Sequence, residues 1–97
     1  LFELAAQQGD ADSMYNLGVM YDLGQGVEQS DERAKGYWGQ AAHVGYPGAQ
    51  YNLGHMYYTG QGVEKDTAQA REWWSKAAAQ GHANSIKNLK ILEKNMK

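Results

Sequence analysis

Apolar or small residues recur at every third or fourth position in two successive stretches of this chain, and a glycine-rich turn separates the two. Such spacing places these residues on one face of a helix. The face consists of Met14, Leu17, Gly18 and Tyr21 in the first stretch, and of Ala34, Tyr37, Trp38, Ala41 and Ala42 in the second. Gly24 is expected to end the first helix, because glycine adopts the left-handed conformation without steric penalty. The pattern therefore predicts a helical hairpin.

The hairpin pattern occurs twice, at a period of 36 residues. Of the 36 positions that align between residues 11–46 and 47–82, 16 are identical, and YNLGVMYDLGQGVE at 15–28 returns as YNLGHMYYTGQGVE at 51–64. A period of about 20–50 residues is typical of stacked units, each of which buries its apolar face only against its neighbours. The sequence therefore predicts a stack of helical hairpins.

Capping residues predict where the helices begin. Ser30 and Asp66 precede the second helix of each unit, and both are favoured N-caps because their side chains accept a hydrogen bond from a free amide. Pro47 stands in the first turn of the following helix, where a missing N–H removes no hydrogen bond. Trp38 and Trp74 occupy matched positions, so we expect each ring to wedge into the neighbouring unit.

We interpret residues 1–97 as one all-α repeat domain and as a piece of a longer array. Its segments are the second helix of a truncated repeat (1–9), two full repeats (11–46 and 47–82) and a C-terminal capping helix (83–97). In the last of these, Lys90 stands where the two full repeats have glycine. A charged residue at this position suits the polar end of an array.

The N-terminal end of the chain differs in character, because Leu1, Phe2 and Leu4 lack the neighbouring unit that would cover them. We therefore expect possible self-association of the chain through this truncated face. Sedimentation at high concentration tests that expectation, and a strictly monomeric profile would count against it.

The recurring residues form the pattern A-x-x-x-Y-N-L-G-x-x-Y-x-x-G-x-G-V-x-x-D-x-x-x-A-x-x-W-x-x-x-A-A-x-x-G. It runs from Ala11 to Gly45, with Ser30 at the aspartate and Tyr37 at the tryptophan position, and again from Pro47 to Gly81, with Pro47 at the leading alanine position. This pattern resembles the Sel1-like repeat, a relative of the tetratricopeptide repeat. The resemblance implies a right-handed α/α superhelix, or solenoid, of antiparallel helix pairs. It also implies an adaptor or scaffold role, since members of that family assemble protein complexes.

The resemblance further implies where a partner would bind, because the first helix of each unit lines the concave surface in related solenoids. The expected contact residues are spaced by three and four, on faces opposite Leu17 and Leu53. They are Asp12, Tyr15, Val19 and Asp22 in the first unit, Gly48, Tyr51, His55 and Tyr58 in the second, and Asn84, Lys87, Ile91 and Lys94 in the last helix. Asn16 and Asn52 lie beside this row and could hold an extended peptide backbone. The alternative is that Tyr15 and Tyr51 pack between helices and that both asparagine amides bond locally.

Charge and composition narrow the classes of partner and site. The net charge of −2 argues against a nucleic-acid binder dominated by phosphate contacts. Without cysteine the chain can form neither a disulfide framework nor a thiolate zinc site, and both cytoplasm and periplasm are compatible with its composition. No apolar run approaches the roughly 20 residues of a membrane span, so we expect no direct insertion into a membrane.

The sequence offers little support for catalysis. His43, His55 and His82 fall at different repeat positions, and no other metal-ligand motif accompanies them. The Gly-Gln-Gly turns lack the third glycine and the preceding strand of a dinucleotide loop. Residues 10–14 begin like a calcium loop but place Met14 where an oxygen ligand is required. We therefore expect no catalytic residue, cofactor or metal ion, and interpret the chain as non-enzymatic.

Three functional hypotheses follow. The first is a protein-interaction scaffold that binds a protein or peptide partner along the concave face. The second is a purely structural spacer within a larger protein. The third, a carbohydrate-binding or enzymatic module, is permitted by the aromatic residues but supported by no constellation. Side-chain exposure distinguishes the scaffold from the spacer, because a spacer would bury four side chains between its helices: Tyr15, Tyr51, His55 and Tyr58.

Overall fold

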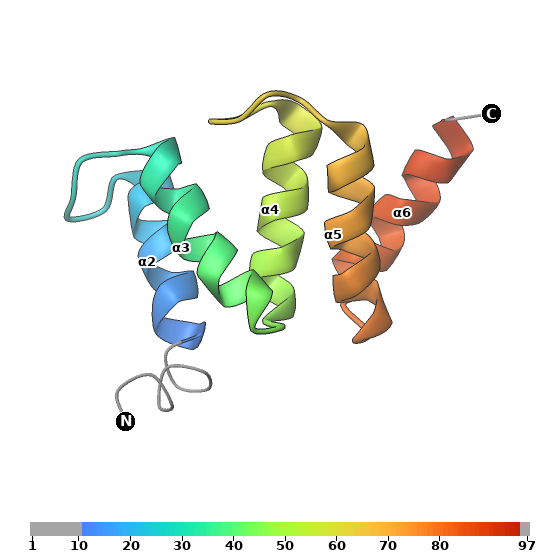
Figure 1. Cartoon of the computed structure of the whole chain (residues 1–97), viewed down its shortest axis with the longest axis horizontal. Coiled ribbons are helices and arrows are strands. Elements are labelled where there is room, and N and C mark those ends of the chain that lie inside the picture. The colour runs from blue at the N-terminus through green and yellow to red at the C-terminus, as the bar shows by residue number, and fades with distance from the viewer. Residues whose placement is uncertain (1–10, 96–97) are drawn as a thin grey trace.

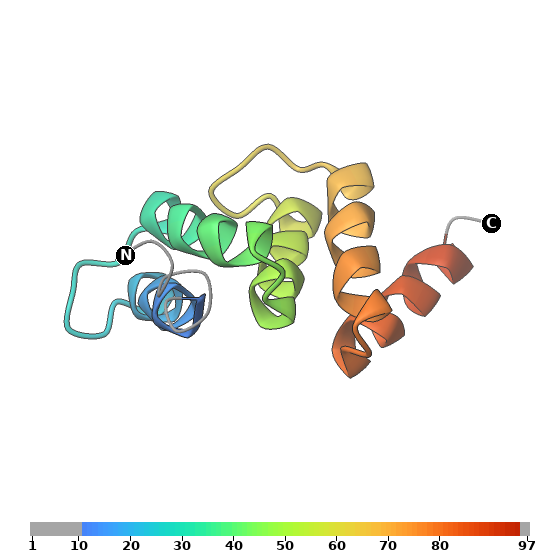
Figure 2. The same cartoon turned by 60° about the horizontal axis from the view of Figure 1, so that its bottom comes forward.

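Five helices stacked in chain order make up the part of the molecule that the structure, a computed structural model, describes: residues 11–95. Each helix has 13 residues: α2 (Ala11–Leu23), α3 (Asp31–His43), α4 (Pro47–Thr59), α5 (Thr67–Ala79) and α6 (Ala83–Asn95). Each packs against the next one in the chain, and the order is kept from one end of the molecule to the other (Figures 1 and 2). No strand occurs within 11–95, so the predicted all-α solenoid is confirmed. The segment expected at 1–9 and the N-terminal face with Leu1 lie outside the described residues.

The helices begin and end at the predicted capping residues. The Ser30 hydroxyl accepts from the backbone N–H of Arg33 at 3.1 Å, and the Asp66 carboxylate accepts from that of Gln69 at 3.2 Å. Pro47 opens α4, and Gly60 ends it with a φ of 78°, in the left-handed region that glycine enters without penalty. These local signals therefore act as the sequence predicts.

A backbone hydrogen bond closes each hairpin at its turn. The amide of Ser30 donates to the carbonyl oxygen of Tyr21 at 2.9 Å, and the amide of Asp66 donates to that of Tyr57 at 2.8 Å. In both turns the donor is the N-cap residue of the second helix, and the acceptor lies in the last turn of the first helix. The two full repeats therefore share the same turn geometry.

Each buried tryptophan packs onto a glycine within its own hairpin. The indole N–H of Trp38 donates to the carbonyl oxygen of Tyr15 at 3.1 Å, and that of Trp74 donates to Tyr51 at the same distance. A Cβ built on Gly18 would overlap the Trp38 ring, and equivalent crowding exists at Gly54. The indole thus fills the space next to the glycine in each hairpin.

Trp38 also packs against the next unit, as the sequence predicted, although its indole N–H is hydrogen-bonded within its own hairpin. The ring shares a buried cluster with Ala49, Leu53 and Met56 of α4. The equivalent Trp74 shares a smaller cluster with Leu92 of α6. Each tryptophan therefore stabilises both its hairpin and the junction to the following helix.

A glutamine network adds polar contacts to the junction between the two hairpins. Gln50 at the start of α4 is 4% exposed, and its amide donates to the carbonyl oxygen of Ala42 at 3.1 Å. The amide of Gln80 in turn donates to Gln50 Oε1 at 3.2 Å and to the carbonyl oxygen of Gly45 at 2.8 Å. The buried Gln50 thus finds the partners that a polar group in the interior requires.

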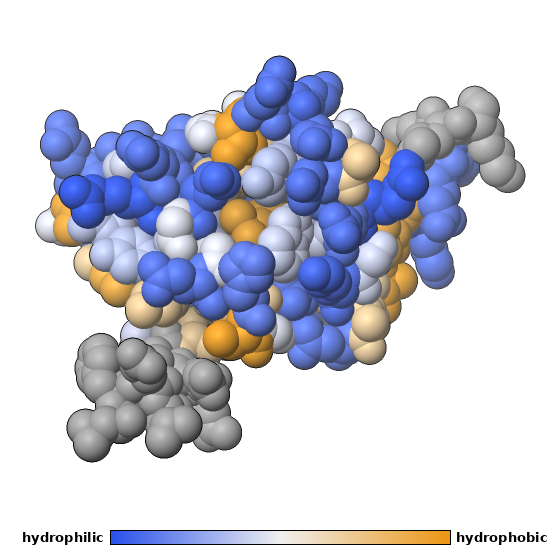
Figure 3. Space-filling model, viewed as in Figure 1, coloured by the Kyte–Doolittle hydropathy of each residue, from blue (hydrophilic) through white to orange (hydrophobic). Residues whose placement is uncertain are grey.

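The two sides of α4 serve different surfaces, because residues two apart on a helix point in nearly opposite directions. Leu53 and Tyr57 face a groove between α3 and α5, which we call the α3–α5 groove. His55 faces the other side, formed by α2, α4 and α6, which we call the α2–α4–α6 face. In the view of Figure 3 hydrophilic residues cover most of the surface, and hydrophobic ones show in the central seam and where α5 meets α6.

Candidate functional site

Two pockets lie next to each other on the α2–α4–α6 face. The first, the α2–α4 pocket, has a volume of about 200 Å³ and is lined by Val19, Asp22, Leu23, Trp38, Asn52, His55, Met56 and Gln61. The second, the α4–α6 pocket, has about 300 Å³ and is lined by Tyr51, His55, Tyr58, Thr59, Trp74, Asn88, Ile91 and Leu92. His55 borders both of them.

The two pockets are the same structural position in consecutive repeats. Adding the repeat period of 36 to the first seven residues of the α2–α4 pocket gives seven of the eight residues that line the α4–α6 pocket. In both cases the buried tryptophan lies at the base, and an asparagine of the following helix, Asn52 or Asn88, forms part of the wall. The fold therefore produces one pocket per repeat.

The α4–α6 pocket is aromatic and open to solvent. Tyr51 stacks on Trp74 with ring centroids 6.4 Å apart, and Tyr58 meets the same indole at 5.5 Å in a tilted arrangement. Tyr58 remains 37% exposed and Ile91 47% exposed. Rings held in this way lose little freedom on binding, which suits a surface that accepts a large apolar side chain.

The α2–α4 pocket carries negative charge at its rim. The side-chain amide of Gln61 donates to Asp22 Oδ1 at 2.7 Å and to Asp31 Oδ1 at 3.0 Å. The amide of Gln29 donates to Asp31 Oδ1 as well, at 2.8 Å. These donors are neutral, so the hydrogen bonds hold the two carboxylates in place without neutralising them.

At the far end of this face, Tyr15 packs against other side chains. Its ring lies 5.1 Å from that of Tyr46, and a Cβ on Gly48 would come within 3.1 Å of it. The hydrogen bond to Asp12, together with burial and the nearby negative charge, raises the pKa of Tyr46 from 10.0 to about 12. Asp12 and Tyr15 are thus engaged in contacts within the molecule.

Replacing Asp12 with Asn should lower the pKa of Tyr46 toward 10, because the negatively charged acceptor is lost. The raised pKa means that the neutral phenol is favoured in the folded state. Its contribution to stability is fully present below about pH 10 and is lost as the pH rises through about 12. NMR titration of ring-labelled tyrosines measures this, with Tyr46→Phe identifying the signal. An unchanged midpoint in the Asp12 variant would contradict the assigned cause.

The structure brings half of the predicted contact residues, Ile91 among them, to these pockets. Val19, Asp22 and Asn52 meet at the α2–α4 pocket, Tyr51 and Tyr58 at the α4–α6 pocket, and His55 at both. The other predicted contact residues that are exposed line neither pocket: Asp12, Asn16, Asn84, Lys87 and Lys94. Lys87 lies one turn before Ile91 on α6, whereas Gly48 lies beneath Tyr15.

Sequence reasoning missed several lining residues. Leu23, Thr59 and Gln61 lie at the end of a first helix or in its turn, outside the row of helical positions. The base formed by Trp38 and Trp74 was expected only as core. The repeat period could have located these residues, because it relates one pocket to the other position by position.

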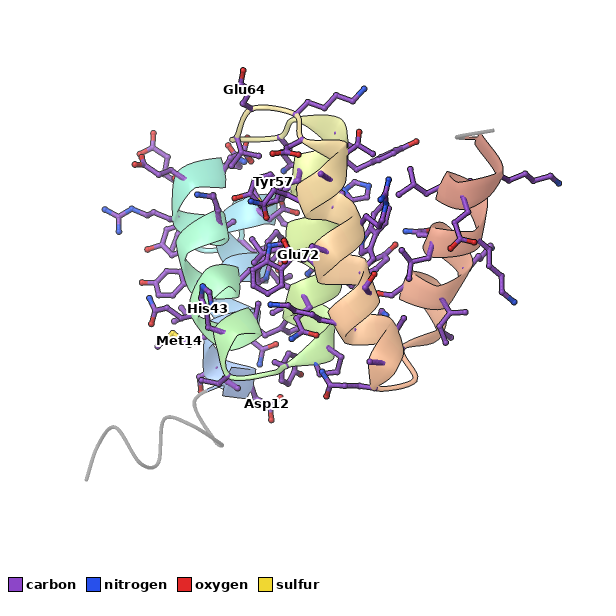
Figure 4. The ribbon with its side chains drawn as sticks, turned by 45° about the vertical axis from the view of Figure 1, so that its right-hand side comes forward. Asp12, Met14, His43, Tyr57, Glu64 and Glu72 are labelled. Atoms are coloured by element: carbon purple, nitrogen blue, oxygen red, sulfur yellow. The ribbon has the colours of Figure 1, made fainter. Side chains whose placement is uncertain are left out.

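The α3–α5 groove is a further hollow, of about 700 Å³, on the other side of α4. Half-buried Trp73 borders it, with His43 edge-on at 5.5 Å and the Lys76 ammonium 4.8 Å from its ring centre. Figure 4 shows His43 and Tyr57 along the seam between α3 and α5. This groove was not predicted from the sequence.

Neither a metal-ligand cluster nor a membrane-spanning helix occurs within residues 11–95. These residues contain no group of three or more His, Cys, Asp or Glu side chains that could hold a metal ion. None of the helices among them is long and apolar enough to cross a membrane.

Comparisons with known proteins agree with the repeat pattern. The Sel1 repeat family profile matches residues 1–10, 11–46 and 47–82. A Sel1 repeat protein from Oxalobacter formigenes is 36% identical and superimposes with a TM-score of 0.85 over 88% of this chain and 35% of its own. A protective antigen of uropathogenic Escherichia coli strains with an SLR fold is 42% identical, with a TM-score of 0.78 over 87% of this chain and 18% of its own. This chain thus spans about a third and a fifth of their lengths, and no curated protein matches it significantly. The chain belongs to the Sel1 repeat family.

Proposed function

We propose that this chain is a protein-interaction scaffold that binds a segment of a partner protein along the α2–α4–α6 face, the side expected to be concave. Sel1 repeats are typically protein-interaction modules. The observation that carries the proposal is the repeated pocket, whose second copy exposes Tyr58 and Ile91 around a tryptophan base. Apolar groups that stay exposed next to a rigid aromatic base are typical of protein-binding surfaces.

Exposure favours this function over a structural spacer. A spacer would bury its tyrosines between helices, yet His55 and Tyr58 are exposed, and Tyr51 is only half-buried. Tyr15 is likewise half-buried, and both tyrosines pack within the molecule, Tyr15 against Tyr46 and Tyr51 against His82, each with ring centroids 5.1 Å apart. Of the two, Tyr51 also lines the α4–α6 pocket. The binding surface we propose therefore begins at the α2–α4 pocket and extends toward α6.

Two isoleucines of α6 provide a matched test of the proposal. Ile91 lines the α4–α6 pocket and is 47% exposed, whereas Ile86 lies outside both pockets and is 36% exposed. Peptides selected on the immobilised chain from a random twelve-residue display library serve as probes. We expect Ile91→Ala combined with Tyr58→Ala to weaken their binding about 10-fold or more, as loss of an apolar anchor does. Ile86→Ala should leave affinity within about 3-fold.

Fluorescence anisotropy measures these affinities, and circular dichroism checks that helicity is kept in every variant. Equal loss of affinity in Ile86→Ala and in the combined Ile91→Ala and Tyr58→Ala variant would contradict the proposal. So would selected peptides that lose affinity only in Trp73→Ala, because that result would move the binding site to the α3–α5 groove.

A further inference from the structure

We infer that the partner segment carries a large apolar residue and, a few residues away, a lysine or arginine. The apolar side chain occupies the α4–α6 pocket, and the cationic side chain occupies the α2–α4 pocket. This inference rests on the proposed function and deepens it, because it assigns a chemistry to each of the two pockets.

The starting point is that two equivalent pockets have different linings. Asp22 at the rim of the first pocket corresponds to Tyr58 in the second, and His55 corresponds to Ile91. At these two equivalent positions, the α2–α4 pocket thus presents a carboxylate and an imidazole, whereas the α4–α6 pocket presents an aromatic and an aliphatic side chain. A ligand that fills both pockets needs two different side chains.

The α2–α4 pocket suits a long cationic side chain better than a purely apolar one. Val19, Leu23 and Met56 supply apolar walls, along which the methylene groups of lysine or arginine can lie. The head group then reaches the half-buried carboxylate of Asp22. Asp31 shares the same Gln61 amide, so a second negative charge lies close by. Because the amides of Gln61 and Gln29 are neutral donors, these hydrogen bonds leave both carboxylates charged, and a cation can form a charge-assisted hydrogen bond with them.

Charges on α6 favour this register over the reverse one. Lys87 and Lys94 are exposed and lie one turn before and one turn after Ile91 on the same face of the helix. They would repel a cationic residue placed at the α4–α6 pocket. A carboxylate at one end of the face attracts the cationic residue of the partner segment, and lysines at the other end repel it. Together they determine the direction in which the segment binds.

The separation of the two pockets limits the spacing within the ligand. They share His55 as a common wall, so a segment can pass directly from one to the other. His55 belongs to α4, which lies between the two pockets. A helix with its side chains is about 10–12 Å across, and an extended chain advances about 3.3 Å per residue. The apolar and cationic residues are therefore expected two to four positions apart.

Synthetic peptides test this assignment. Each carries one tryptophan and one lysine separated by one to six glycine or serine residues, and a companion series carries glutamine or glutamate in place of the lysine. We expect the tightest binding when the two residues lie two to four positions apart. Glutamate in place of lysine should weaken binding about 10-fold, the size of one well-placed charge pair.

The variant Asp22→Asn should remove most of the difference between lysine and glutamine peptides, while its side-chain oxygen can still accept from Gln61. Glu28→Gln is the matched control, because it removes the same charge from an exposed position outside both pockets and should preserve the preference.

The outcomes separate the two proposals. Peptides that bind, lose affinity on Ile91→Ala combined with Tyr58→Ala, and yet show no preference for lysine would overturn the inference and leave the proposed function standing. A lysine preference that Asp22→Asn and Glu28→Gln reduce equally would also overturn it, because it would reflect net charge alone. Peptides that bind without responding to the Ile91 and Tyr58 changes would overturn both.

Discussion

Trp74→Ala is expected to lower the free energy of unfolding by about 3–5 kcal/mol, the range for deleting a large buried aromatic side chain. The Trp74 side chain is 3% exposed, and its ring shares a buried cluster with Leu92 of α6. Its removal would also leave the carbonyl oxygen of Tyr51 without the indole N–H that it accepts at 3.1 Å. Both losses affect the same hairpin and its junction to α6, so a large effect is expected.

Urea denaturation followed by circular dichroism measures the change. The adjacent Trp73 is the matched control, because it is half-buried at the edge of the α3–α5 groove. Trp73→Ala should cost clearly less than Trp74→Ala, since less apolar area returns to water. If Trp74→Ala changed the free energy by under about 1 kcal/mol, the ring would not be part of the core and would be available to a ligand.

Gly54→Ala is expected to destabilise the chain by about 1–3 kcal/mol, the usual range for overpacking a filled interior. Alanine is intrinsically the better helix residue by roughly 0.5–1 kcal/mol. At Gly54 that advantage is outweighed, because the added Cβ would overlap the indole of Trp74, which is fixed by its hydrogen bond to Tyr51. The ring cannot retreat without breaking that bond.

Gly36→Ala is the matched control and should have the opposite sign. Gly36 also lies inside a helix, α3, but nothing comes within 4 Å of a Cβ built there. The same substitution should therefore stabilise the chain by about 0.5–1 kcal/mol. In a Trp74→Ala background, Gly54→Ala should lose most of its cost, because the two effects share one contact. Stabilisation by Gly54→Ala in the unaltered chain would show that the indole moves aside easily.

Local signals in the sequence were sufficient to predict the positions of the helices and their order along the chain. Ser30, Asp66, Pro47 and Gly60 act within a few residues of their own position, so a one-dimensional pattern contains what they do. The repeat period then predicted the stacking. The packing of Trp38 onto Gly18 was harder to predict, because both residues were recognised as recurrent but nothing in their spacing says that one fills the space above the other.

The candidate site could be predicted only as far as helical spacing extends. Tyr51, His55 and Tyr58 follow from that spacing, and they do surround a pocket. Gln61 lies in the turn after α4, and its contact with Asp22 joins residues 39 positions apart, which no local pattern contains. Tyr15 follows from the same spacing, but its contact with Tyr46, a residue of the following connection, is not contained in that spacing. Whether these residues bind a partner remains a prediction.

The tryptophan hydrogen bonds described above have a mechanical consequence. Each indole joins the two helices of one hairpin by a hydrogen bond. We therefore expect each hairpin to move as a rigid unit and the stack to bend between consecutive hairpins. The α2–α4 pocket has walls from both hairpins, and the α4–α6 pocket has walls from the second hairpin and α6, with His55 of the second hairpin bordering both. Bending of the stack is therefore expected to widen or narrow the pockets. A ligand bound in both pockets would resist this bending and so fix the curvature of the array.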